Sequence, residues 1–162
     1  MAGWTYRLED TPRGTRRVIS LDSALPIAIG GSGLQAVQLV FVDDPVAGYD
    51  CLIQLASGDF KRSHARAPRV QWTVDERAAI DVLASQPEAM PPRLSLREPR
   101  HRWFELDGAS RLSAAFRGAD HKRHRVLFDV SNLDRSQLDW DQQRYAQLYR
   151  EQQEKARAGT QA

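Results

Sequence analysis

The stretch that decides the fold is Ala36-Val-Gln-Leu-Val-Phe-Val42, a run of branched and aromatic side chains. Such residues fit the half-buried surface of a pleated sheet. The turn-forming Asp43-Asp-Pro-Val-Ala-Gly48 follows it, and the chain then returns as the apolar Tyr49-Asp-Cys-Leu-Ile-Gln-Leu55. Together these segments predict two antiparallel strands at the centre of a mainly β protein.

Alternation of apolar and polar side chains, the period of a half-buried strand, recurs on both sides of this centre. It predicts strands over residues 4–8, 17–21, 69–74 and 125–130. Gly30-Gly-Ser-Gly33 predicts a hairpin connection, because glycine adopts the backbone angles of tight turns at little cost. We therefore expect an antiparallel sandwich or a partly open barrel.

Three segments carry helical signals. Asp107–Gly118 predicts a short helix, with Asp107 as its cap, a terminal glycine and an apolar face in between. Residues 75–84 fit either a helix or a strand. From Asp134 onward apolar residues recur at helical spacing, which predicts a long amphipathic helix with a polar tail. The expected organisation is a β-sandwich domain over 1–133 and a C-terminal helix and tail over 134–162.

Composition excludes several classes of protein. The chain has 162 residues, of which 41% are hydrophobic and 27% charged, as in an ordinary globular domain. It contains no apolar run of the roughly 20 residues that a transmembrane helix needs. No signal peptide is visible, so we expect a cytoplasmic protein, or a periplasmic one whose leader has been removed. The net charge of +2 gives no general affinity for nucleic acid.

The residues that most often carry chemistry do not form a recognisable motif. A single cysteine, Cys51, excludes an intrachain disulfide and lies among apolar residues, where a buried and inert thiol is expected. His121 and His124 have the spacing of a metal pair on a helix, but basic neighbours favour a solvated hairpin. No Gly-x-Ser-x-Gly elbow is present. We therefore predict no catalytic residue, no metal and no cofactor.

Basic residues concentrate in three stretches, over 61–69, 93–102 and 117–125. Two explanations stay open at this stage. Charge runs are usually solvated surface, which would make these three separate loops. If the strands instead bring the stretches together near aromatic side chains, they would form a site for phosphate or an acidic protein. The candidate binding residues are Arg62, Arg66, Arg69, Arg100, Arg102, Arg123 and Arg125, with Tyr145 and Tyr149 on the C-terminal helix.

Six short motifs follow one another in a distinctive order. They are Trp4-Thr-Tyr6, Ala36-Val-Gln-Leu39, Gly58-Asp-Phe60, Arg69-Val-Gln-Trp-Thr-Val-Asp75, Arg111-Leu-Ser-Ala-Ala-Phe116 and Phe128-Asp-Val-Ser-Asn-Leu133. This order resembles small β-sandwich proteins of the bacterial cell envelope, including type VI secretion accessory proteins of the VasI or TagO kind. The chain departs from them in lacking a cysteine pair near the Gly-x-Phe turn and in having Asn132 where they have glycine. The resemblance implies binding or accessory work.

The sequence therefore predicts a non-catalytic module that binds another protein, as an envelope or secretion-system accessory protein or an immunity protein. The alternative is a nucleic-acid-binding module that uses the arginine clusters together with aromatic side chains. That alternative predicts binding that weakens steeply with salt. The C-terminal helix could pack on the domain through its first half and project at its end, or dock on a partner.

Overall fold

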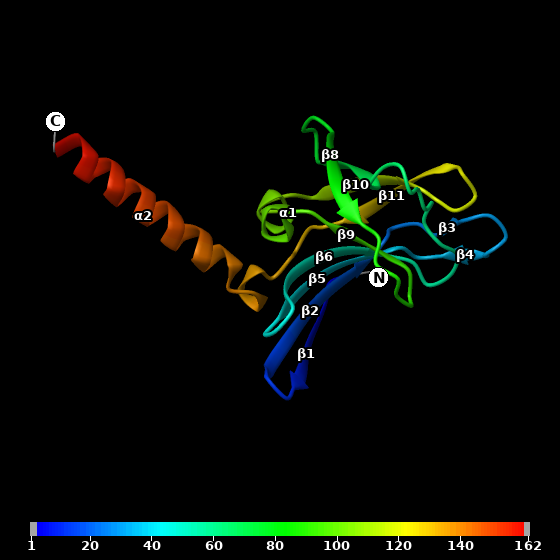
Figure 1. Ribbon diagram of the computed structural model, residues 1–162, viewed down its shortest axis with the longest axis horizontal. Helices are drawn as coiled ribbons and strands as arrows, with labels where there is room; N and C mark the ends of the chain where they lie inside the picture. Colours follow the sequence, from blue (N-terminus) through cyan, green and yellow to red (C-terminus); the bar gives the residue numbers. More distant parts are fainter. Residues whose placement is uncertain (1–2, 161–162) are drawn as a thin grey trace.

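The computed structural model describes residues 3–160, and in this range the body is one nine-stranded antiparallel sheet with two open edges (Figure 1). The strand order is β1-β2-β5-β6-β9-β8-β7-β10-β11. The bounds are β1 Thr5–Thr11, β2 Gly14–Asp22, β5 Gln38–Asp44, β6 Gly48–Gln54, β7 Arg69–Val74, β8 Ile80–Ser85, β9 Arg93–Leu96, β10 Arg111–Arg117 and β11 Arg123–Asp129. A small separate hairpin joins β3 (Ile27–Ala28) to β4 (Leu34–Gln35).

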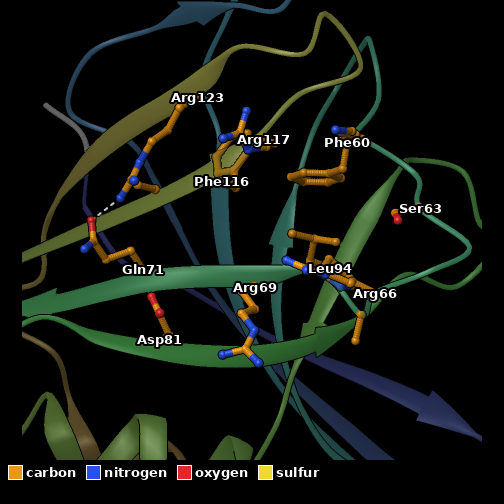
Figure 2. A pocket seen from close by; sticks show the side chains of 14 residues that line it. Phe60, Ser63, Arg66, Arg69, Gln71, Asp81, Leu94, Phe116, Arg117 and Arg123 are labelled. Atoms are coloured by element: carbon orange, nitrogen blue, oxygen red, sulfur yellow. Dashed lines mark hydrogen bonds between the residues drawn. The ribbon is translucent and has the colours of Figure 1, made fainter.

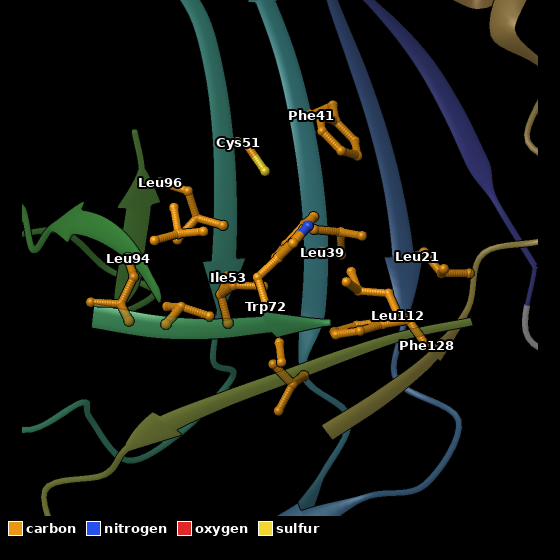
Figure 3. Close-up of a cluster of buried hydrophobic side chains, with 14 of the residues drawn as sticks. Leu21, Leu39, Phe41, Cys51, Ile53, Trp72, Leu94, Leu96, Leu112 and Phe128 are labelled. Atoms are coloured by element: carbon orange, nitrogen blue, oxygen red, sulfur yellow. The ribbon is translucent and has the colours of Figure 1, made fainter. Parts of the chain in front are cut away.

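The sheet folds over near β8 and β9, so that its two halves face each other across one core (Figure 3). The half made of β2, β5 and β6 contributes Leu39, Phe41 and Ile53, while β7 and β11 contribute Trp72 and Phe128 from the opposite side. All five side chains are almost completely buried. Alternate residues of a strand point to opposite faces, which is why the alternating segments build this core. The predicted mainly β, antiparallel fold class is confirmed.

The central strand pair forms as predicted. β5 and β6 pair antiparallel with Phe41 opposite Cys51, and β1 pairs with β2 with Tyr6 opposite Ile19. The glycine-rich stretch connects β3 to β4, and Gly33 has a φ of 81°, a conformation that favours glycine. Cys51 is completely buried in the core as expected, and that burial raises the pKa of its thiol.

The short helix predicted over Asp107–Gly118 is wrong. Residues 111–117 form strand β10, which pairs with β7 on one side and β11 on the other. The alanine-rich stretch fits both the helical and the strand period, and two flanking ladders favour the strand. The short helix is instead α1 (Pro99–Glu105), with Pro99 in its first turn. The ambiguous 75–84 stretch becomes a turn followed by β8.

The predicted C-terminal helix is present as α2 (Trp140–Thr160), preceded by the 3-10 turn η1 (Arg135–Gln137). Its first residue anchors it, because Trp140 is completely buried and packs edge-on against Trp103 at 5.6 Å. The Arg144 guanidinium lies over the ring of Phe104 at 4.8 Å. Beyond Arg144 the helix projects away from the sheets (Figure 1). Packing is thus limited to the first turn rather than to the first half.

Candidate functional site

An open pocket of about 540 Å³ lies beside the loop over residues 61–68, which starts next to the end of β10 in space and leads into β7. The Lys61 amide donates to the Arg117 carbonyl at 3.0 Å, whereas β7 pairs with β10 only as far as Gln71 opposite Ala115. The residues between these two attachments therefore loop out from β10. The hollow that they leave is walled by this loop and by β7, β8, β10 and β11 (Figure 2).

The floor of the pocket is apolar and firmly packed. It includes Phe60, Leu94 and Phe116, which are 1%, 1% and 3% exposed. The two phenyl rings contact each other edge-to-face with their centroids 5.0 Å apart. Such packing fixes the floor, because both rings also belong to the dense core of the protein.

The walls of the pocket are strongly basic. Val70 and Trp72 of β7 point into the core, so Arg69 and Gln71 point outward toward the pocket. Five cationic side chains line it, against the single carboxylate of Asp81: Lys61, Arg66, Arg69, Arg117 and Arg123.

Among residues 3–160, none of these five cations forms an ion pair with a carboxylate. Arg123 donates instead to the amide oxygen of Gln71, and Arg117 to the carbonyl of His121 at 3.4 Å. Six arginines outside the pocket do form ion pairs: Arg7, Arg16, Arg62, Arg102, Arg111 and Arg135. A concave surface with unneutralised cations focuses a positive potential and attracts anions.

The fold joins two of the three basic stretches of the sequence. Arg66 and Arg69 from the first stretch and Arg123 from the third line the same pocket. Gln71 and Asp81 also line the pocket and were not predicted from the sequence, because neither lies in a charge run. Only the pairing of β7 with β8, which sets Gln71 opposite Asp81, brings them there.

Two further candidates lie beside the pocket without lining it. Arg62 points back toward Asp59, with its Nε 3.4 Å from a carboxylate oxygen. Arg125 is two residues beyond Arg123 on the same outward face of β11, and its Nε donates to the Ser113 hydroxyl at 2.7 Å.

The second basic stretch does not join this surface. Arg102 is only 5% exposed, and its Nε lies 2.7 Å from Oε1 of Glu105. Burial raises the pKa of Glu105, and the Arg102 guanidinium opposes this shift. Arg100 lies over the ring of Tyr49 at 4.6 Å and donates to Gln143 of α2 at 2.8 Å. Helix α1, which was not predicted, turns these arginines toward structural contacts.

The turn that joins β10 to β11 borders the pocket and is held by Asp120. Its carboxylate accepts from the amides of Lys122 at 3.1 Å and Gly30 at 3.0 Å, and contacts Nε2 of His124 at 2.9 Å. Partial desolvation acts to raise the pKa of Asp120, but the hydrogen bonds to His124, Lys122 and Gly30 outweigh it and lower that pKa to about 2. The turn is therefore tied to the β3–β4 hairpin by an ionised group.

This carboxylate predicts a specific pH dependence of stability. A depressed pKa stabilises the folded protein above the unfolded value of 3.8, and the stabilisation is lost as the pH falls through about 2. Asp120→Asn should therefore lower the free energy of unfolding at neutral pH, with the difference shrinking between about pH 4 and pH 2. Urea denaturation of both proteins across this range measures it. A difference that stays constant down to about pH 2 would contradict the assignment.

The two candidate tyrosines lie apart from the pocket on the projecting part of α2. Tyr145, Leu148 and Tyr149 are 65%, 44% and 63% exposed, and their spacing puts them on one face of the helix. Since they do not support the body, we expect the double variant Tyr145→Ser, Tyr149→Ser to change its free energy of unfolding by less than about 0.5 kcal/mol. Guanidinium denaturation followed by tryptophan fluorescence tests this. A loss above about 1 kcal/mol would show that the stripe packs on the body.

Among residues 3–160, no group of three or more histidine, cysteine or acidic side chains is placed to hold a metal ion. His121 lies in the β10–β11 turn with a φ of 65°, while the ring of His124 faces Asp120. In the same range no helix is long and apolar enough to cross a lipid bilayer.

Comparison with known proteins gives no family for the chain. No protein-family model matches it, and no curated protein sequence matches it. One solved structure that is similar is invasion associated protein b from Bartonella henselae, with 11% sequence identity and a TM-score of 0.49. The match covers 80% of this chain and 88% of that chain. A likeness this distant assigns neither a family nor a function.

Proposed function

We propose that the protein is a non-catalytic binding module whose basic pocket takes an acidic segment of another protein. The observation that carries this proposal is the set of five cations around one pocket, none of which has a carboxylate partner among residues 3–160. Arginine binds carboxylates through paired hydrogen bonds, which gives both affinity and orientation.

The apolar part of the lining adds a second requirement for the ligand. A peptide in which acidic residues flank an apolar side chain would place that side chain against Ala67 and Pro68, the apolar lining residues that are not buried, while its carboxylates face the arginine walls. Binding sites commonly combine an apolar base with a few oriented polar groups in this way. The volume of about 540 Å³ accommodates a few residues rather than a whole folded surface.

The nucleic-acid alternative has weaker support. Single-stranded nucleic acids are usually held by a basic groove together with aromatic side chains on which bases stack. The aromatic residues considered for that role, Phe60, Trp72 and Trp103, are at most 1% exposed and form the core. The cations surround a compact hollow, and only one carboxylate lies among them.

The accessory role implied by the sequence resemblance, or the related role of an immunity protein, forms part of the proposal. In such a role the protein would recognise an acidic partner and carry out no chemistry on it. One carboxylate, and no histidine or cysteine, accompanies the cations among the described residues that line the pocket, which favours binding over turnover.

Fluorescence anisotropy tests the proposal with two labelled probes of equal length, a Glu-rich peptide containing one Leu and a single-stranded oligonucleotide. We expect the peptide to bind with a dissociation constant on the order of micromolar and to weaken between about 50 and 200 mM salt. A peptide with Lys in place of every Glu should not bind. Tighter binding of the oligonucleotide at both salt concentrations would contradict the proposed ligand class.

A further inference from the structure

Strand β1 forms an open edge of the sheet. Its last residue, Thr11, faces Gly14 across a two-residue turn, and such a closing pair is hydrogen-bonded. Hydrogen-bonded and non-bonded pairs alternate along antiparallel strands, so the backbone groups of Tyr6, Leu8 and Asp10 point away from β2. No described backbone group bonds to them from that side. Figure 1 shows β1 at the outer limit of its half of the sheet.

This edge has only part of the usual protection against pairing with another strand. Edge strands are commonly short, charged, interrupted by a bulge or proline, or covered by a loop, and of these devices β1 has only its charges, Arg7, Glu9 and Asp10. β1 has seven residues, contains no proline and pairs with β2 without a break. At the opposite edge of the sheet, the carbonyl of Leu127 in β11 accepts a bond from the amide of Ala24 at 2.7 Å. Of the two edges, β1 is therefore the more open.

We propose that two copies of this protein associate edge to edge through β1, antiparallel and around a two-fold axis at Leu8. In this register all seven residues overlap. Leu8 of one copy faces Leu8 of the other, Arg7 faces Glu9, and Thr5 faces Thr11. The sheets of the two copies then become continuous.

The charges on β1 favour a second copy of the same strand as its partner and also determine the register of the pairing. Arg7 and Glu9 lie one residue to either side of Leu8 and share a face of the strand. A two-fold axis at Leu8 therefore sets Arg7 of each copy opposite Glu9 of the other. An axis one residue earlier would place Arg7 against Arg7, and one residue later Glu9 against Glu9, both of which are repulsive. A strand that complements itself around one residue is the signature of a two-fold contact between identical chains.

The contact would also cover apolar surface that the single copy leaves in water. Leu8 is 72% exposed, although it lies in a strand. Arg7 and Glu9 are within reach of each other in the single copy at 3.7 Å, with both side chains largely solvated. An exposed pair of this kind contributes little, so it does not compete strongly with pairing between copies.

Sedimentation velocity on the full chain, from a few to several hundred micromolar, tests the proposal without any ligand for the pocket. We expect a reversible dimer. Arg7→Glu should raise its dissociation constant about tenfold or more, because both ends of the contact then oppose like charges. The double variant R7E/E9R should recover part of the affinity, since each pair between the copies is restored with its signs exchanged, while the new arginine lies opposite Arg16 of its own copy.

Two controls separate this contact from other causes. Arg13→Glu makes the same charge change in the adjacent exposed turn and should leave the dimer intact. The Tyr145→Ser, Tyr149→Ser variant of α2 should also dimerise normally. Glu9 faces Arg16 in β2, so a substitution at position 9 changes a contact within the sheet. Thermal unfolding of each variant therefore checks that the variant protein is still folded. A monomer at every concentration, a dimer insensitive to R7E, or a dimer lost in the α2 variant would overturn the proposal.

Discussion

Replacing Trp72 with alanine is expected to lower the free energy of unfolding by about 3–5 kcal/mol, the usual cost of deleting a large buried aromatic side chain. Trp72 is 1% exposed and lies between the two halves of the sheet (Figure 3). Its removal would leave a cavity where β7 packs against β5 and β6. Urea denaturation followed by circular dichroism measures the loss.

Trp72→Phe is the matched control for this prediction. The indole Nε1 of Trp72 is buried and has no hydrogen-bond partner among the described residues. Phenylalanine keeps most of the packing and removes this unsatisfied donor, so we expect a loss below about 1.5 kcal/mol. Equal losses for the two variants, or a loss below about 1 kcal/mol for Trp72→Ala, would show that the halves do not share this core.

Reversing three charges of the pocket should remove ligand binding while leaving the fold intact. We expect Arg66→Glu, Arg69→Glu and Arg123→Glu in one protein to weaken binding of the Glu-rich peptide by about 100-fold or more, because three of the five cations become anions that repel it. All three side chains are exposed, so stability should change little. Anisotropy with the peptide probe measures the affinity.

A second triple variant separates the pocket from the effect of net charge. Arg13→Glu, Arg97→Glu and Arg150→Glu make the same change in net charge at exposed positions that do not line the pocket. We expect this protein to bind within about threefold of the wild type at moderate salt, where distant charges are screened. Equal weakening by both triple variants would mean that the peptide responds only to the overall charge.

The strands of the core could be predicted where composition or one period dominated the pattern. The branched and aromatic run of β5 and the strict alternation of β7 both form strands of the core. Strand β10 could not be predicted, because its alanines satisfy the helical and the strand period equally and the pairing with β7 and β11 decides. Helix α1 was not predicted because it has only seven residues, about two turns, with no acidic residue in its first turn.

The candidate site could be predicted only in part. A run of charged residues is visible in the sequence, whereas a pocket is formed by segments that are distant in the sequence. The basic stretches around Arg66 and Arg123 were visible, but their meeting depends on the bond between Lys61 and the Arg117 carbonyl, far apart in the chain. The same limit explains Arg102, whose burial follows from a helix that the sequence did not reveal. Contacts between residues distant in the sequence, rather than composition, decide which arginines line the pocket and which are buried.

The most direct test of the central claim is amide chemical-shift mapping of the isotope-labelled protein with the Glu-rich peptide. If the unneutralised cations form the binding site, the shifted amides should concentrate in residues 61–71 and 115–123, and the shifts should fade as salt is raised. A protein that shows no shifts at millimolar peptide, or shifts confined to α2, would contradict the account.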